Sequence, residues 1–597
     1  MKIYARVFDK ERKVVDHILR LNIEGNKYAI NYTKLRKEKV FLVGPKGTLP
    51  IRWYSSLKIK GRKYYAFCVG KKLYLTTELN KVYRRKSKLK TMITKKYTIF
   101  YGLYSDISSK KYIDHDNVFL NDKLVCKIQR PFKNIPKLKH LAIIKINNEE
   151  IFNSGVVHSD VRIGKDLEYS LPLKLKKKRK GINYYSRKQI GDRYILIRTT
   201  ISSGTVKVVN IPMEKEYKKY YLFKNWLAYR LSKIIGKKNI ILMFEKETNK
   251  ANESGYYIFD KIMKKKNLKS KVYFVIDKNS PDFQKVYSKH PKNTLVKYSF
   301  KHYLYIYISK YFISSELSNH VINPRLYIRS INDAIKRKPL IFLQHGIMFA
   351  KPVDNPAAAG FKKNNGSVRF YKCVVSSDLE ATQFYRLGYN DKDLIKCGLT
   401  KFDVSKQNPK ADKIMFMPTY RYWEEAKVMN PNTIKDTTYY KNYMTVIEKF
   451  KKAGLLDRLS ISCHPKFADC LIEADPIYEN IVEKDINKGL ENAKIFITDY
   501  SSASYDAHYR GAYIIYYWAE RDYLIENYKA IPPVNEKNCD GVPVFDVDSL
   551  IKEVKRAISK NYKMDQKYEN RYKKINEFHD GKNGDRLIKE LKKLGII

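Results

Sequence analysis

The segment Ile495-Phe-Ile-Thr-Asp-Tyr-Ser-Ser-Ala-Ser-Tyr-Asp506 decides the fold class. Its first three residues predict a short buried strand, and the hydroxyl residues that follow are typical of the start of a helix. Similar apolar runs, separated by helix-length segments, occur at 240–244, 272–276, 311–313 and 340–343, and then at 373–375, 414–417, 459–463 and 513–517. Continuous apolar strands with helical crossovers indicate parallel sheets covered on both faces. Two such series predict an α/β protein with two doubly wound domains, at 239–370 and 371–597.

The first 210 residues or so have a different pattern. Short β-branched and aromatic runs at 64–69, 97–101 and 194–199 are separated by polar turns, which predicts strands. A basic stretch at 84–90 resembles a connector, so we expect two β-rich accessory modules, at 1–90 and 91–212. No catalytic constellation is found in this region.

A basic amphipathic helix is predicted within 213–238, between these modules and the first α/β domain. Five apolar residues recur at helical spacing, with Trp226 beside them: Tyr220, Phe223, Leu227, Leu231 and Ile234. Lysines and arginines fill the other positions, the pattern of a helix that lies in a membrane interface. The alternative is an ordinary helix whose apolar stripe packs on the protein.

The net charge restricts the choice of partners. The 597 residues include 119 Lys+Arg and 61 Asp+Glu, so the formal net charge is +58. A composition rich in Lys, Ile, Tyr and Asn explains part of this excess, and an anionic membrane or a polyanionic substrate is compatible with it. No nucleic-acid-binding module is found, so no nucleic-acid partner is expected.

The location of the protein can also be predicted. Seven cysteines form no C-x-x-C pair, which favours a reducing compartment. No run has the length of a membrane span, and the charged residues near Met1 do not fit a signal peptide. We therefore expect a cytoplasmic protein.

Polar clusters follow four of the predicted strands, where open parallel sheets bind their ligands. They are Gln344-His-Gly346, Pro418-Thr-Tyr-Arg421, His464-Pro-Lys466 and Thr498-Asp-Tyr-Ser-Ser-Ala-Ser-Tyr-Asp506. Two of them have a structural alternative: His345 as a core histidine, and Asp499 or Ser501 as a simple helix cap. Four such clusters together favour a functional site.

Phosphoryl transfer from a nucleotide diphosphate suits these residue types. A histidine with an ordinary pKa can accept a proton from an attacking hydroxyl, while cations, hydroxyls and helix-end amides hold a diphosphate. No metal or other cofactor is expected, because helix capping explains the Asp546-Val-Asp548 motif better than metal binding. The chain lacks a P-loop and a strand-coupled G-x-G-x-x-G, which disfavours an NTPase or a dehydrogenase.

At these residues the chain resembles the CDP-glycerol glycerophosphotransferase family, the teichoic acid primases and polymerases of Gram-positive bacteria. The resemblance covers roughly residues 239–595 and includes Gly398-Leu-Thr-Lys-Phe-Asp403 and a terminal Asp580-Gly-Lys582. It implies a GT-B-like pair of Rossmann-type domains, with the acceptor bound by 239–370 and the CDP donor by 371–597. It also implies a membrane-associating helix before them and a β-rich N-terminal region.

The resemblance also assigns roles to residues. His345 matches the proposed catalytic base, and His464 matches the histidine that contacts the donor diphosphate. The expected donor-binding residues are Gln344, Gly346, Lys401, Pro418, Thr419, Arg421, Ser501, Ser502 and Asp506. Gln344 stands where the family commonly has Trp, and Lys401 stands where it usually has Arg, so bidentate phosphate recognition is lost there.

The implied function is transfer of a polyol phosphate, most simply glycerol phosphate, from a CDP-activated donor to an undecaprenyl-linked or polymeric acceptor, with release of CMP. Such an enzyme would act peripherally at the cytoplasmic face of the membrane, and it could form homo-oligomers. The alternatives are a ribitolphosphotransferase, a GT-B glycosyltransferase acting on a wall or capsule glycan, and a non-catalytic protein that binds membranes or polyanions.

Overall fold

The computed structural model of the protein divides into two units, Met1–Met213 and Glu214–Ile597. In the second unit it describes 214–323, 328–364, 368–428, 433–463, 465–474 and 476–597. In the first it describes 3–8, 14–19, 22–24, 27–31, 39–44, 47–50, 55–59, 62–69, 72–76, 88–104, 117–128, 140–154, 157–164, 166–168, 170–173, 175, 186–199 and 205–213.

The described part of the first unit consists almost entirely of antiparallel sheets, so the expected β-rich region is confirmed. A four-stranded sheet has the order β2-β1-β5-β6, and a five-stranded sheet has the order β3-β4-β9-β8-β7. Their bounds are β1 Ile3–Phe8, β2 Val14–Leu19, β3 Asn22–Glu24, β4 Lys27–Asn31, β5 Lys39–Gly44, β6 Gly47–Pro50, β7 Ser55–Ile59, β8 Arg62–Val69 and β9 Lys72–Thr76.

Two further antiparallel sheets share a core that includes Phe100, Ile144, Val161 and Ile195. One has the order β10-β11-β14, and the other has the order β13-β12-β15-β19-β18-β17, with β16 paired to β15. The elements are β10 Lys88–Ile93, β11 Tyr97–Tyr104, β12 Asn117–Leu120, β13 Lys123–Lys127, β14 His140–Asn147, α3 Asn148–Asn153, β15 His158–Gly164, β16 Ser170–Pro172, β17 Ser186–Ile190, β18 Arg193–Thr199 and β19 Val206–Pro212.

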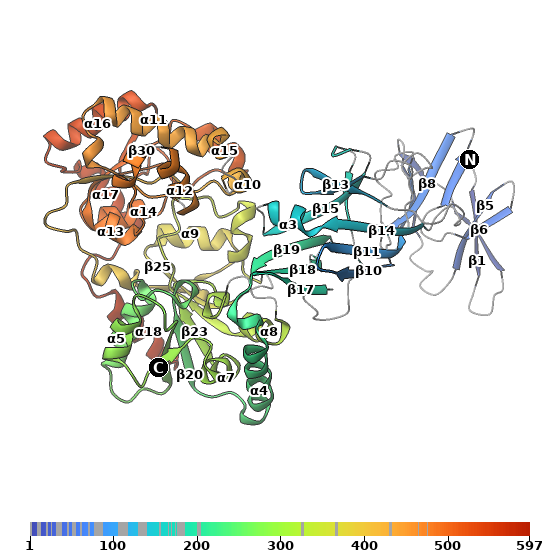
Figure 1. Ribbon diagram of the computed structural model, residues 1–597, viewed down its shortest axis with the longest axis horizontal. Helices are drawn as coiled ribbons and strands as arrows, with labels where there is room; N and C mark the ends of the chain where they lie inside the picture. Colours follow the sequence, from blue (N-terminus) through green and yellow to red (C-terminus); the bar gives the residue numbers. More distant parts are fainter. Residues whose placement is uncertain are drawn as a thin grey trace. The chain divides into compact units, whose positions relative to one another are not determined.

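The second unit contains two wholly parallel sheets, as the sequence predicts (Figure 1). The first has the order β22-β21-β20-β23-β24-β25-β26. Its strands are β20 Ile240–Phe244, β21 Lys271–Ile276, β22 Thr294–Val296, β23 Tyr311–Ser314, β24 Pro339–Phe342, β25 Arg369–Val375 and β26 Leu394–Lys396. Its helices are α5 Ser254–Met263, α6 Phe283–Lys289, α7 Phe300–Ile308, α8 Arg329–Arg337 and α9 Asp378–Arg386.

Successive residues of β20 point to opposite faces of this sheet. Ile241 and Met243 join a core with α5, whereas Leu242 and Phe244 join a second core with α7 and α8. Both faces are therefore buried, which explains the continuous apolar runs in the sequence.

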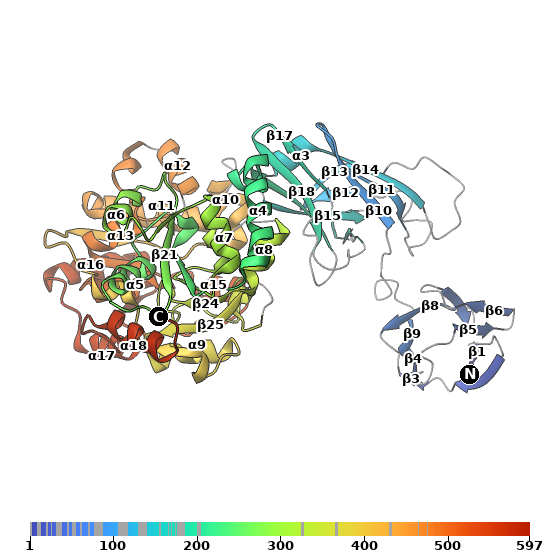
Figure 2. The same cartoon turned by 90° about the horizontal axis from the view of Figure 1, so that it is seen from below.

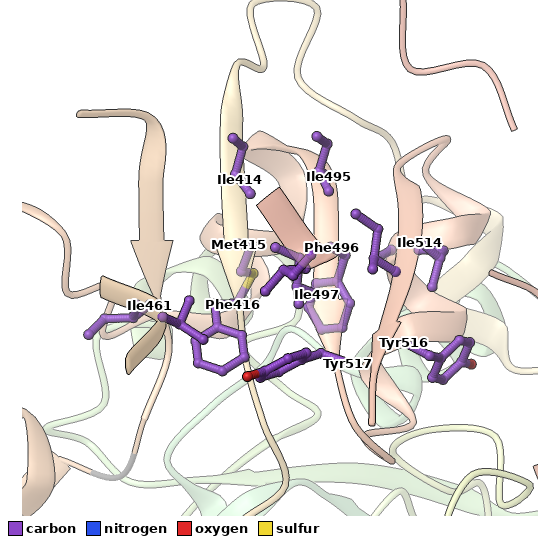
Figure 3. Close-up of a cluster of buried hydrophobic side chains, with 14 of the residues drawn as sticks. Ile414, Met415, Phe416, Ile461, Ile495, Phe496, Ile497, Ile514, Tyr516 and Tyr517 are labelled. Carbon is purple, nitrogen blue, oxygen red and sulfur yellow. The ribbon is translucent and has the colours of Figure 1, made fainter. Parts of the chain in front are cut away.

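The second sheet has the order β28-β27-β29-β30-β31. Its strands are β27 Lys413–Phe416, β28 Leu459–Ile461, β29 Ala493–Thr498, β30 Tyr513–Tyr517 and β31 Val542–Val544. Its helices are α10 Glu425–Val428, α11 Thr438–Lys452, α12 Pro465–Ala474, α13 Ile486–Asn492, α14 Ala503–Tyr509, α15 Arg521–Tyr528 and α16 Val547–Ser559. Figure 3 shows its core, in which Phe416, Phe496 and Ile514 are fully buried. Asp546 accepts a hydrogen bond from Ser549 N (2.7 Å), so the predicted capping of α16 is confirmed.

The division between the two sheets differs from the expected boundary near residue 370. The run at 373–375 lies in β25, which pairs with β24 in the first sheet, and β26 extends that sheet further. The residue pattern of a buried apolar strand is the same whichever sheet it belongs to. Periodicity alone therefore could not assign 373–375 to the first sheet. The second sheet begins only at β27.

The chain returns to the first sheet at its C-terminal end. α17 (Gln566–Ile575) contributes Tyr568 to the core of the second sheet and Ile575 to that of the first. α18 (Asn583–Lys593) then packs on the first sheet through Leu587 and Leu591.

The basic helix predicted within 213–238 is α4, Lys219–Ile235, which lies along α7 (Figure 2). Asn225 and Ala228 are buried, and Asn225 accepts a hydrogen bond from the Tyr307 hydroxyl (2.7 Å). The outer side of the helix exposes large apolar residues: Tyr220 (61%), Phe223 (59%), Trp226 (51%) and Ile234 (83%). Among the described residues, no helix is both long enough and apolar enough to span a bilayer.

Candidate active site

The turn after β24 is held in an uncommon backbone conformation. Gln344 has a φ of +61°, in the left-handed region that non-glycine residues rarely occupy. Its side chain is buried, and Nε2 donates hydrogen bonds to Val374 O (2.5 Å) and to Glu380 Oε1 (3.0 Å). These contacts hold the turn that presents His345 at the end of the strand.

Glu380, on α9, fixes this turn from behind. Its carboxylate also accepts hydrogen bonds from Met348 N and Ser376 N, both at 2.6 Å. Burial raises the pKa of Glu380 to about 7, although these hydrogen bonds favour its charged form.

Gly346 lies directly against α14 of the second sheet. A Cβ atom at this position would lie 2.9 Å from Ser502 Oγ and 3.9 Å from Asp506 Oδ2. Only glycine allows such a close approach of the backbone. The structure therefore brings together two of the predicted strand-end clusters, one from each sheet.

Lys401 connects the same two clusters. Its buried ammonium lies 2.5 Å from Asp506 Oδ1, donates a hydrogen bond to His345 O (2.5 Å), and lies 3.6 Å from Glu253 Oε2. Burial alone would lower the pKa of Lys401, but Asp506 and Glu253 raise it above its ordinary value. Lys401 is thus a stable cation between the sheets.

The His345 side chain keeps contact with solvent. The surrounding protein nevertheless removes water from the imidazole, and this desolvation, together with the cations Lys401 and Lys351, lowers the pKa of His345 to about 4. Asp506 has a smaller effect that raises it. The imidazole is therefore neutral at pH 7 and can accept a proton. Its pKa is lower than the ordinary value that the sequence argument assumed.

The cluster after β27 is engaged in contacts within its own domain. Thr419 donates hydrogen bonds from N and Oγ1 to Asp499 Oδ1 (2.7 and 2.6 Å), which ties β27 to β29, and Pro418 is buried beside it. Arg421 is buried and pairs with Glu520. Within the described part of the chain, Nε of Arg421 has no hydrogen-bond partner, so one donor remains for a ligand.

The two serines before α14 have different surroundings. Ser501 Oγ accepts a hydrogen bond from Ala503 N (3.3 Å), the local capping that was the alternative interpretation. Ser502 is the N-cap residue, but its side chain makes no capping bond, and it faces Gly346. Because α14 has only seven residues, the hydroxyls and not a long helix dipole must supply most of any anion binding. His464 lies outside the described residues.

Sequence reasoning missed the polar groups after two further strands of the first sheet. After β20, Glu245 is buried and accepts hydrogen bonds from Asn252 N (2.9 Å), Glu253 N (3.0 Å) and Tyr256 N (2.7 Å). After β23, burial raises the pKa of Glu316 to about 7 and lowers that of His320 to about 4, with Lys246 and His345 contributing to the latter. The signal was present, because Glu245-Lys-Glu247 and Ser314-Ser-Glu316 follow apolar runs as the four recognised clusters do.

A family model described as CDP-Glycerol:Poly(glycerophosphate) glycerophosphotransferase matches residues 227–593, more than half of the chain. The chain belongs to this family. The expected resemblance is thereby confirmed, and the family is one of enzymes. The matched segment spans both parallel sheets and most of α4.

One similar protein is named for a role in teichoic acid biosynthesis. The minor teichoic acid biosynthesis protein GgaB of Bacillus subtilis (strain 168) is 24% identical to this chain over 391 residues. The aligned part covers 62% of this chain and 41% of GgaB. The chain thus spans about two-fifths of the length of that curated relative.

Among solved structures, the wall teichoic acid polymerase TagF is 15% identical with a TM-score of 0.41, covering 63% of this chain and 99% of that one. UDP-GlcNAc 2-epimerase from Methanocaldococcus jannaschii is 13% identical with a TM-score of 0.35, covering 59% and 99%.

Proposed function

We propose that the protein transfers a polyol phosphate, in the first instance glycerol phosphate, from a CDP-activated donor to a lipid-linked or polymeric acceptor of a teichoic acid-like polymer. Family membership supports the reaction class. The observation that carries the proposal is the contact of Gly346 with Ser502 and Asp506, which sets the His345 turn against the predicted donor cluster.

His345 is the proposed general base. Its neutral imidazole removes the proton from an acceptor hydroxyl as that oxygen attacks the phosphorus that carries the glycerol. The bond between this phosphorus and the bridging oxygen breaks, and CMP leaves with the electron pair. Ser501, Ser502 and His464 are proposed to hold the diphosphate and to stabilise the charge on the leaving CMP.

The low pKa of His345 is consistent with a base that becomes stronger when the donor binds. Desolvation lowers this pKa most, and Lys401 and Lys351 lower it further; the effect of these two cations is opposed when a doubly charged diphosphate binds beside them. Donor binding therefore raises the pKa of His345 and makes the imidazole a stronger base once both substrates are present. Lys401 also fixes the backbone of His345 by its hydrogen bond to the carbonyl oxygen.

Peripheral membrane binding is the second part of the proposal. The exposed aromatic residues of α4 are accompanied by cations on the same helix: Arg230 lies 5.7 Å from the Trp226 ring, and Lys224 lies 4.2 Å from the Tyr220 ring. Aromatic rings beside basic side chains suit the interface of an anionic bilayer. A lipid-linked acceptor would be delivered at the same surface.

The test is to incubate the purified full chain and a His345→Ala variant with CDP-glycerol, CDP-ribitol or a UDP-sugar, together with a glycerol phosphate acceptor. We expect CMP release from CDP-glycerol, reduced roughly 10²- to 10⁴-fold in the variant, which is the usual contribution of a positioned base. Faster CMP release from CDP-ribitol than from CDP-glycerol would show that the transferred group is ribitol phosphate and not glycerol phosphate. Release of UDP alone would favour a glycosyltransferase, and wild-type turnover by the folded variant would exclude His345 as the base.

A further inference from the structure

A polar pocket of about 280 Å³ lies beside Lys401, between helices of the two parallel-sheet domains. α6 lines it on one side, and α13 with the end of α14 on the other. Its charged lining residues are Lys285, Lys401, Lys488, Arg510, Asp485 and Glu491.

Positive charge predominates in this pocket once the internal ion pairs are considered. Lys401 is balanced by Asp506 (2.5 Å). Asp485 is balanced by Lys250 (3.3 Å) and caps α13 through Asn487 N (3.0 Å). Lys488 lies 3.9 Å from Glu483. Of the charged lining residues, this leaves Lys285 and Arg510 with Glu491.

Arg510 lines the pocket and has an unused hydrogen-bond donor. Its NH1 donates to Asp506 O (3.4 Å), but its buried Nε has no hydrogen-bond partner among the residues that the structure describes. A buried N–H without a partner is unfavourable, so a ligand that accepts from it would be stabilised. Guanidinium groups recognise phosphate oxygens especially well.

Lys285 is held in place on the opposite wall. Its Nζ donates to Ala251 O (2.6 Å) and lies 4.7 Å from the centre of the Tyr256 ring. An ammonium group has three protons, so two remain for a ligand. A fixed ammonium and a guanidinium with a free N–H that line the same pocket suit an anion with several acceptor oxygens.

The position of the pocket separates it from the donor cluster. Ser502, Asp506 and Arg510 lie at successive turns along α14, and eight residues of helix correspond to about 12 Å. Ser502 faces Gly346 at one end, whereas Arg510 lines the pocket at the other. An anion in the pocket is therefore distinct from a donor diphosphate at Ser501 and Ser502.

We propose that this pocket binds a phosphodiester of the acceptor chain, behind the terminal unit whose hydroxyl reaches His345. The inference rests on the proposed function and deepens it, because it names the substrate group that the enzyme recognises on the acceptor side. An acceptor that already carries phosphates is bound at both places, whereas a neutral acceptor is bound only near His345. The enzyme thus favours extension of a charged chain.

Kinetics with synthetic glycerol phosphate oligomers and with glycerol as a neutral acceptor test this inference. We expect Arg510→Gln and Lys285→Gln each to raise the KM for the oligomers about tenfold, while the KM for CDP-glycerol and the rate with glycerol change less than twofold. Lys289→Gln, one turn further along α6 and exposed, is the matched control and should behave like the wild type. An unchanged KM for oligomers in both variants, or a raised KM for CDP-glycerol instead, would overturn the proposal.

Calorimetric titration of the same oligomers without donor separates this inference from the proposed function. Oligomer binding by the wild type that is lost in Arg510→Gln supports the pocket even if no CMP is ever released. Equal binding by the wild type and both variants rejects the pocket even if transfer is normal. Thermal unfolding of each variant checks that the fold is kept.

Discussion

Gln344 and Glu380 are joined by a hydrogen bond of 3.0 Å that links the turn before His345 to the buried side of α9. Both side chains are buried within the first sheet domain. Their effect is on geometry, because they hold a left-handed residue immediately before the proposed base.

Glu380→Gln should lower kcat more than it changes the KM for CDP-glycerol. The single oxygen of the new amide can still accept hydrogen bonds from Met348 N and Gln344 Nε2. Its NH₂ group, however, would face Ser376 N, and two donors cannot form a hydrogen bond with each other. We expect kcat to fall about 10- to 100-fold, because small misplacements of a catalytic group have effects of that size. Asp378→Asn, an exposed change on the same helix, is the control. A variant with normal kcat would show that the turn does not depend on this carboxylate.

The pH dependence of the reaction should report the state of His345. With a pKa of about 4 in the free enzyme, the imidazole is neutral above that pH, and kcat/KM should fall only as the pH drops toward 4. Bound diphosphate raises the pKa of His345, so the acid limb of kcat should lie at a higher pH than that of kcat/KM. Initial rates from pH 4 to 9 measure both limbs, and coincident limbs would contradict coupling between donor and base.

Removal of both hydroxyls before α14 should weaken donor binding. In Ser501→Ala/Ser502→Ala, the lost hydrogen bonds to a charged diphosphate correspond to about 1–3 kcal/mol, and the KM for CDP-glycerol should rise accordingly. The exposed change Ser288→Ala serves as the control. Wild-type donor affinity in the double variant would place the diphosphate elsewhere.

Membrane association should depend on α4 and its surroundings. Each interfacial cation contributes about 1 kcal/mol on an anionic leaflet, and salt weakens the attraction. Replacement of Lys218, Lys219, Lys224 and Arg230 with Glu should therefore reduce co-sedimentation with anionic liposomes. The same charge change at the exposed Lys264, Lys265, Lys266 and Lys269 is the matched control. If both quadruple variants lost binding equally, only total charge would matter and α4 would have no special role.

Much of the α/β fold followed from the sequence because buried parallel strands leave continuous apolar runs. β20 and β30 have the bounds that the runs at 240–244 and 513–517 predict. The three-residue strands β22, β26 and β31 were missed, since so few apolar residues do not stand out from loops. The assignment of 373–375 to the wrong sheet has another cause, namely that sheet membership is set by packing between distant segments.

The candidate site was only partly predictable for a similar reason. The polar residues that follow predicted strands included His345, Ser502 and Asp506. That the turn of His345 lies next to Ser502 and Asp506 is seen only in the structure. The ion pair of Lys401 with Asp506 and the buried Glu380 carboxylate depend on tertiary contacts between elements far apart in the chain. No local pattern encodes such contacts.

The return of the chain to the first sheet has a mechanical consequence. Asp403, on the segment that leaves the first sheet, accepts hydrogen bonds from Asn583 N and Gly584 N (both 2.8 Å), at the start of the helix that comes back. Two crossings fastened side by side restrict how far the two domains can separate at this point. Lys401 lies two residues before Asp403 and pairs with Asp506, so the ion pair between the domains stands next to the place where they are tied together.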